Sequence, residues 1–232
     1  MIICLYHGSS INSVNLEQTS NITNYIEQFT NDIVISAYYS KKAVRNLKAN
    51  HNILIDYYLD VIKDNYHQDQ IFILITNIMN GIEYKKILQN IKEIDIDSKV
   101  KLTKNLMHPQ NINNFADCLD GTNDYTVYIG HGNRKDHDCY NQLNNLLNAK
   151  NIKVITLYDD VNNVINNLEH KCITLKPLMI TKAYHVTNDI ENSMLDSLKD
   201  TNVQIIMDNK PLCFNQKLLR LLKQNILEIT KK

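Results

Sequence analysis

Residues 125–132 read Tyr-Thr-Val-Tyr-Ile-Gly-His-Gly, an apolar run that ends in a histidine between two glycines. Residues 2–8, Ile-Ile-Cys-Leu-Tyr-His-Gly, show a similar pattern near the start of the sequence. Short, nearly uninterrupted apolar runs are typical of parallel strands that are covered on both faces. The two stretches therefore predict a buried strand in each half of the chain, followed by a loop that carries a histidine.

Apolar runs and amphipathic stretches alternate along the rest of the chain. The expected strands are 1–6, 32–38, 70–76, 125–130, 152–157, 171–175 and 202–206. The expected helices are 14–29, 53–65, 82–93, 110–118, 136–148, 159–168, 188–199 and 214–229. Such alternation predicts an α/β fold with mainly parallel sheets.

A weak internal repeat indicates two similar lobes. Besides the two histidine loops, the pairs Ile78-Met79 and Leu178-Met179 each follow a later strand. We therefore expect an α/β lobe at 1–118 and another at 119–232, each a mainly parallel sheet flanked by helices, with a cleft between them. The Asp120-Gly121 turn marks the expected boundary, and the last helix is compatible with either lobe. Sheets of this kind bind ligands at the carboxyl ends of their strands.

Composition excludes several classes of protein. The 25 basic and 25 acidic residues give a formal net charge of zero, which argues against a general binder of nucleic acid or membrane surfaces. No apolar run approaches the roughly 20 residues of a membrane span. The five scattered cysteines form no CxxC pair, so we expect a cytoplasmic protein without a disulfide framework or thiolate zinc site. A homo-oligomer is compatible with the sequence.

Glycine is scarce, with five residues in 232, and four of them lie in three short loops: Gly8, Gly81, Gly130 and Gly132. Glycine is favoured where the backbone adopts a positive φ or comes close to a ligand. The three loops are therefore candidate site loops. No GxSxG, P-loop, GxGxxG or HExxH motif is present, which removes the commonest classes of hydrolase, nucleoside triphosphatase and dehydrogenase.

Two histidines in the second half follow expected strands. His131 lies between Gly130 and Gly132, and His185 precedes an expected helix. A neutral imidazole can bind a divalent metal ion or accept a proton near neutral pH. The alternatives are a turn histidine that caps the next helix for His131 and a hydrogen-bonded polar histidine for His185. For His7, a turn histidine beside the following glycine is at least as compatible with the sequence.

Charged residues adjoin the same loops. Glu83 follows the Asn80-Gly81 loop and is either a helix-terminal carboxylate or a base in the cleft. Lys41, Arg45 and Arg134 are compatible with solvated surfaces or with contacts to a polyanionic ligand.

These segments together resemble the two-lobed class II chelatases, the sirohydrochlorin cobaltochelatases of anaerobic cobalamin synthesis. The resemblance spans most of the chain and keeps the order of the motifs. It is carried by Gly8-Ser9-Ser10, Ala37-Tyr38-Tyr39-Ser40, Ile78-Met79-Asn80-Gly81-Ile82-Glu83-Tyr84, Tyr128-Ile129-Gly130-His131-Gly132 and Pro177-Leu178-Met179 through His185 and Asn188-Asp189.

The resemblance implies a lyase that inserts Co²⁺ into a carboxylate-rich tetrapyrrole held between the lobes. It implies metal ligation by His131 and His185, and catalysis by these two residues with Glu83. The metal ion is a substrate, Fe²⁺ and Ni²⁺ are alternatives to it, and no organic cofactor is expected. We expect contacts with the tetrapyrrole from Ser9, Ser10, Lys41, Arg45 and Arg134.

The sequence departs from this family at two positions. The family's third ligand is a glutamate on the strand after the histidine loop, and Thr156 stands there. His7 replaces the family's usual aromatic residue and resembles the smaller, single-lobe chelatases. Asp159, Asp160 and His7 are alternative third ligands, and the sequence does not choose among them. A homologue that binds a tetrapyrrole or metal without inserting it is the competing hypothesis.

Overall fold

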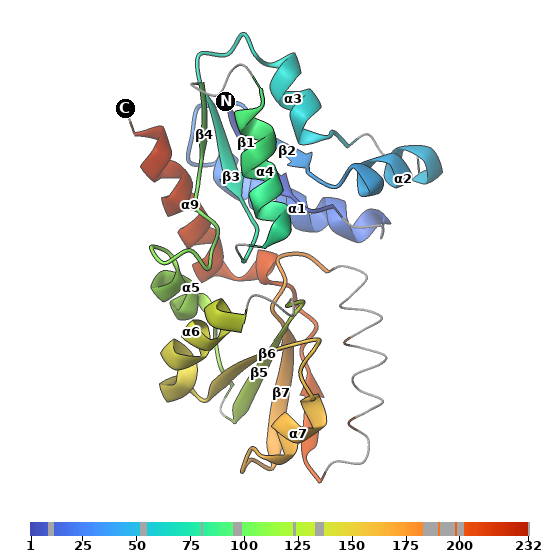
Figure 1. Ribbon diagram of the computed structural model, residues 1–232, viewed down its shortest axis with the longest axis vertical. Coiled ribbons are helices and arrows are strands. Elements are labelled where there is room, and N and C mark those ends of the chain that lie inside the picture. Colours follow the sequence, from blue (N-terminus) through green and yellow to red (C-terminus); the bar gives the residue numbers. More distant parts are fainter. Residues whose placement is uncertain are drawn as a thin grey trace. The chain divides into compact units, whose positions relative to one another are not determined.

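A computed structural model describes residues 1–8, 12–51, 55–79, 81–94, 99–122, 124–132, 137–182, 190, 198 and 202–231 (Figure 1). The chain divides into two compact units. Unit 1 comprises Met1–Asn111 and Cys213–Lys232, and unit 2 comprises Ile112–Leu212. The Asp120-Gly121 turn lies within unit 2, and the C-terminal helix returns to unit 1.

Unit 1 is built on a parallel sheet in the order β2-β1-β3-β4. The strands are β1 (Ile2–Tyr6), β2 (Val34–Tyr38), β3 (Ile71–Ile75) and β4 (Val100–Leu102). Every residue of β1 and β3 is buried. Since β1 pairs with β2 up to Tyr6 opposite Tyr38, and with β3 up to Leu5 opposite Ile75, the three strands end at the same edge of the sheet.

Helices cover the sheet of unit 1 (Figure 1). They are α1 (Asn12–Glu27), α2 (Lys41–His51), α3 (Tyr58–Asp64), α4 (Ile82–Lys92) and α9 (Gln216–Thr230). Helix α1 contacts β1 and β2, whereas α9 contacts β3. A single-turn helix, Leu212–Phe214, precedes α9. The Asn215 side chain accepts hydrogen bonds from the amides of Lys217 and Leu218 and fixes the first turn of α9.

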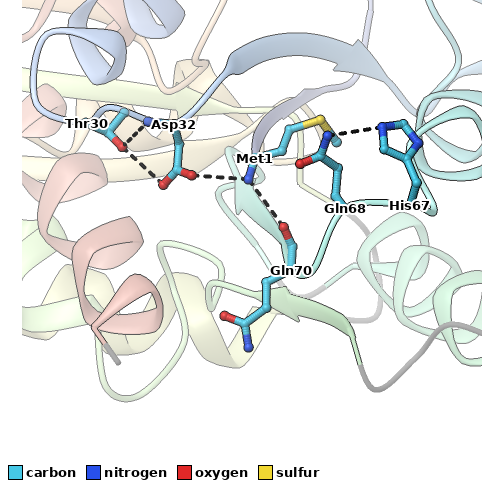
Figure 2. A network of polar contacts seen from close by, with 6 residues as sticks. All are labelled: Met1, Thr30, Asp32, His67, Gln68 and Gln70. Carbon is cyan, nitrogen blue, oxygen red and sulfur yellow. Dashed lines mark hydrogen bonds and ion pairs between the residues drawn. The ribbon is translucent and has the colours of Figure 1, made fainter.

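The start of β1 is held by polar contacts at the opposite edge of the same sheet. The Met1 ammonium donates to Asp32 Oδ1 and to the Gln70 carbonyl, both at 3.3 Å (Figure 2). The Thr30 hydroxyl bonds the other oxygen of Asp32 and accepts from its amide. A neighbouring contact joins Gln68 Nε2 and His67 Nε2 at 3.2 Å. These contacts join the starts of three segments of the sheet and lie away from the strand ends that carry the candidate site.

Unit 2 repeats this topology with a parallel sheet in the order β6-β5-β7-β8. Its strands are β5 (Tyr125–Gly130), β6 (Ile152–Thr156), β7 (Cys172–Pro177) and β8 (Gln204–Met207). Its helical segments are α5 (Ile112–Cys118), α6 (His137–Leu147), the single turn Asn148–Lys150 and α7 (Val161–Asn166). A core that includes Val127, Ile129 and Leu175 packs against α7 through Val161 and Ile165.

The predicted α/β class with parallel sheets is confirmed, and all seven predicted strands are present. Strand β4 and helix α2 were not among the predicted elements. β4 has only three residues, of which one is buried, so it leaves little hydrophobic signal. Most of the predicted helix 188–199 lies outside the described residues. No helix within the described part of the chain is long and apolar enough to cross a membrane.

Candidate functional site

The carboxyl edge of the unit 1 sheet gathers three polar side chains. His7 follows β1, Tyr39 follows β2 and Asn77 follows β3. The Tyr39 amide donates to the Tyr6 carbonyl at 3.0 Å, which continues the pairing of β1 and β2 beyond their ends. Since β1 lies between β2 and β3, all three side chains start from one edge of the sheet.

Glu83 completes this group from the first turn of α4. His7 Nε2 lies 3.2 Å from Glu83 Oε1, and the Tyr39 hydroxyl donates to Glu83 Oε2 at 3.1 Å. Asn77 Nδ2 donates to the Tyr39 oxygen at 3.1 Å. The His7 and Tyr39 rings meet edge-on, with centroids 5.0 Å apart. We call these four residues the Glu83 cluster.

Charge in the Glu83 cluster is set by these contacts. Partial burial lowers the pKa of His7, but the Glu83 carboxylate and a hydrogen bond with the Gly8 backbone raise the pKa more, so that its net shift is upward. Burial and the neighbouring Glu83 raise the pKa of Tyr39 well above its ordinary value. Tyr39 is therefore a neutral hydrogen-bond donor, and His7 favours the protonated form more than an isolated histidine does.

His131 occupies the equivalent strand end of unit 2, directly after β5. Its side chain is exposed, its Nδ1 lies 3.0 Å from the Gly132 carbonyl, and its ring meets Tyr158 edge-on at 6.4 Å between centroids. A neutral ring that donates from Nδ1 to this carbonyl carries its lone pair on Nε2. The nitrogen that can ligate a metal is thereby defined.

The glycines on either side of His131 are required by close packing. A Cβ on Gly130 would lie 2.8 Å from the Tyr140 hydroxyl, and one on Gly132 would overlap the side chain of Thr156. Gly132 also has a φ of 65°, in the left-handed region. Gly81 differs, because its φ is −83° and a Cβ would meet nothing closer than 3.8 Å. Conformational need therefore explains the scarce glycines around His131 and does not explain Gly81.

Thr156 is a packed structural residue and is only 1% exposed. Its amide and hydroxyl both donate to Asp159 Oδ2, at 2.6 and 2.9 Å. Asp160 caps α7 by accepting from the Asn163 amide. These bonds give the two aspartates local roles. Among the described residues, no group of three or more His, Cys, Asp or Glu side chains is arranged to hold a metal ion.

The remaining predicted substrate contacts are partly described. Lys41 and Arg45 are exposed at the start of α2, four residues apart on one helix face. Lys41 Nζ lies 4.9 Å above the centre of the Tyr57 ring. Four residues of the predicted site lie outside the described part of the chain: Ser9, Ser10, Arg134 and His185.

A family model identifies the chain. The model described as "Cobalt chelatase (CbiK)" matches residues 1–213, which include all the candidate site residues. The chain belongs to the cobalt chelatase (CbiK) family. It is therefore a chelatase, an enzyme that places a metal ion in a tetrapyrrole. A search of curated proteins finds no match to the sequence.

Solved chelatase structures share the fold of this chelatase at low sequence identity. The sirohydrochlorin chelatase SirB from Bacillus subtilis subspecies spizizenii in complex with cobalt has a TM-score of 0.66 and 12% identity, over 98% of this chain and 93% of that one. SirB from Bacillus subtilis with Fe³⁺ has a TM-score of 0.64 and 12% identity, over 98% and 94%. A multi-domain Deinococcus radiodurans protein with structural similarity to chelatases has a TM-score of 0.62 and 11% identity, over 100% of this chain and 55% of that one.

Tyr39 and Asn77 of the chelatase were not predicted as site residues. Tyr39 lies in segment 37–40, which carries part of the family resemblance, and Asn77 directly follows the expected strand 70–76, so both positions carried a signal. Neither residue type points to metal chemistry, and only the folded structure shows that their side chains form a hydrogen-bonded chain to Glu83.

Proposed function

We propose that this chelatase inserts Co²⁺ into sirohydrochlorin during anaerobic cobalamin synthesis. The match to the cobalt chelatase family over residues 1–213 carries the proposal. His131 supports it as well, because its imidazole is exposed on a loop whose close packing requires a glycine on either side. Solved structures of the same fold with cobalt and with Fe³⁺ make Fe²⁺ the first alternative, followed by Ni²⁺.

The reaction exchanges protons for a metal ion. Two pyrrole N–H bonds break, the two nitrogens and their neighbours bind M²⁺, and two protons leave, without a change of oxidation state. The metal must lose bound water before it enters the ring, and the protons need acceptors. A site with few protein ligands and open coordination positions suits such a transfer better than a closed four-ligand site.

His131 is proposed as the principal metal ligand and base. Neutral imidazole binds borderline divalent ions such as Co²⁺ through a nitrogen lone pair, and it accepts a proton near neutral pH once the ion has left. The contact between Nδ1 and the Gly132 carbonyl supports ligation through Nε2. His185 is proposed as the second ligand, and this role rests on the resemblance alone.

Glu83 is proposed as the carboxylate that receives pyrrole protons. Its location in the first turn of α4 favours a negative charge, and each of its oxygens has a partner in the Glu83 cluster. Lys41 and Arg45 are exposed cations and suit the carboxylates of the tetrapyrrole. Arg134, Ser9 and Ser10 are proposed for the same task from the resemblance. The tetrapyrrole is the expected partner, and the cytoplasm is the proposed compartment.

A visible-spectrum insertion assay tests this proposal. Purified protein is mixed with sirohydrochlorin and Co²⁺, Fe²⁺ or Ni²⁺, and each rate is compared with the same mixture without protein. The proposal expects the largest acceleration with Co²⁺. A higher rate with Fe²⁺ or Ni²⁺ overturns the cobalt assignment, and binding without acceleration by any ion identifies the non-catalytic alternative.

A further inference from the structure

The two oxygens of Glu83 have partners of different kinds, and the partner of Oε1 is an exposed side chain. The Glu83 side chain is 56% exposed, and the His7 side chain that contacts Oε1 is 54% exposed. An exposed ion pair between two rotatable side chains holds its geometry weakly. The contact with His7 alone therefore does not define where the carboxylate lies.

The contact on the second oxygen of Glu83 is built differently. Tyr39 lies where β2 leaves the sheet, and its amide is bonded to the Tyr6 carbonyl. Asn77 lies just past β3, and its backbone carbonyl accepts a hydrogen bond from the Leu106 amide at 3.2 Å. Both residues behind Oε2 are thus attached to the sheet or to the loop that packs on it.

The hydrogen bonds that link Asn77, Tyr39 and Glu83 all point towards the carboxylate. The Asn77 amide nitrogen donates to the Tyr39 oxygen, so the single hydroxyl proton is directed at Glu83 Oε2. Asn77 Oδ1 is buried without a hydrogen-bond partner among the described residues. A buried amide oxygen without a partner lowers stability. The hydrogen bond from Asn77 Nδ2 to Tyr39 is a functional explanation for an asparagine at this position.

We propose that Tyr39, oriented by Asn77, is the positioning residue for Glu83, and that it aims the carboxylate at the substrate. Tyr39 itself touches no reacting atom in this proposal. It rests on the proposed function, because it gives Glu83 a task in metal insertion. Its distinctive consequence is that Tyr39 acts only through Glu83.

Tyr39→Phe removes the hydroxyl and keeps the ring. The neighbouring variant Tyr38→Phe is a matched control, because the Tyr38 hydroxyl is hydrogen-bonded to the Thr19 hydroxyl at 3.0 Å rather than to Glu83. A hydrogen bond to a charged group corresponds to about a tenfold effect or more. We expect kcat for Co²⁺ insertion to fall about tenfold in Tyr39→Phe and to stay within about twofold of wild type in Tyr38→Phe. Circular dichroism verifies that each variant is folded at the assay temperature.

A double-mutant cycle separates positioning from a general structural role. In a Glu83→Gln background, Tyr39→Phe is expected to lower kcat no further. An equal tenfold loss in that background overturns the proposal, as does a Tyr39→Phe rate equal to that of Tyr38→Phe.

A measurement without substrate keeps this proposal distinct from the proposed function. The His7 ring is titrated by NMR in wild type, Tyr39→Phe, Tyr38→Phe and Glu83→Gln. If Tyr39 positions Glu83, the pKa of His7 in Tyr39→Phe falls towards its value in Glu83→Gln, whereas Tyr38→Phe matches wild type. A pKa in Tyr39→Phe that equals or exceeds the wild-type value overturns the positioning role. Wild-type protein that fails to insert any metal contradicts the proposed function instead, and leaves this titration to decide on Tyr39.

Discussion

His7 and His131 occupy the same place in two copies of one topology. Each follows the strand that lies second in its sheet, β1 in the order β2-β1-β3-β4 and β5 in the order β6-β5-β7-β8. Their surroundings differ. His7 contacts the carboxylate of Glu83, whereas His131 Nδ1 faces the Gly132 carbonyl and the His131 ring meets Tyr158 edge-on.

This difference assigns different chemistry to equivalent strand ends. A histidine beside a carboxylate favours its protonated form and suits proton handling or substrate contact. A histidine whose Nδ1 faces a carbonyl, on a loop that admits no side chain on either side, suits metal ligation. The two units thus keep one backbone plan and vary the side chains at the strand ends.

Restoring the family's glutamate in unit 2 is expected to have the largest effect on stability. Thr156→Glu buries a charge, loses the bond from the Thr156 hydroxyl to Asp159 and crowds Gly132, so we expect a loss of about 4 kcal/mol in the free energy of unfolding and no gain in metal affinity. Thr156→Ser, the control, should cost about 1 kcal/mol. Urea denaturation and cobalt titration measure both. A stable Thr156→Glu protein that binds Co²⁺ more tightly would show that this strand end is a ligand position after all.

Gly132 and Gly81 should differ in their tolerance of a side chain. Gly132→Ala forces a left-handed alanine against Thr156, and we expect a loss of about 3 kcal/mol. Gly81→Ala has an ordinary φ and open space and should cost less than about 1 kcal/mol, mainly through a poorer N-cap for α4. Thermal melts measure both variants. Equal losses would contradict the packing described around His131.

The ion pair between His7 and Glu83 should make a small, pH-dependent contribution to the free energy of unfolding. The pKa of His7 is raised in the folded state, so its contribution to stability is fully present below its unfolded value near 6.5 and is lost as the pH rises through the folded pKa. Because the pair is half exposed, wild type should exceed His7→Gln by only about 0.5 kcal/mol at acid pH. Urea denaturation at pH values on both sides of the transition provides the measurement. A wild-type advantage that grows with pH would reverse the predicted sign.

Much of this comparison was predictable from the sequence, because buried parallel strands leave continuous apolar runs. The runs at 1–6 and 125–130 identified the central strands and placed His7 and His131 at their ends. A three-residue strand such as β4 leaves almost no such signal.

The contacts at the strand ends were less predictable. The sequence proposed Glu83 as a site residue, but the pairing of its two oxygens with His7 and Tyr39 depends on which strands are neighbours in the sheet. The local use of Asp159 by Thr156 likewise depends on the geometry of the turn after β6. Side-chain pairing across a fold is set by backbone geometry that residue types do not encode individually.

The central claim is that His131 is the metal-handling histidine of this chelatase. Its most direct test is the initial rate of Co²⁺ insertion into sirohydrochlorin by His131→Ala, measured beside His170→Ala. His170 stacks on Tyr125 at the start of β5, at the opposite end of the strand from His131, and serves as a matched control. We predict that the rate of Co²⁺ insertion by His131→Ala is at least about a hundredfold below wild type, near the rate without protein, because the variant lacks a metal ligand and a base. His170→Ala should stay close to wild type. Full activity in His131→Ala would contradict the account.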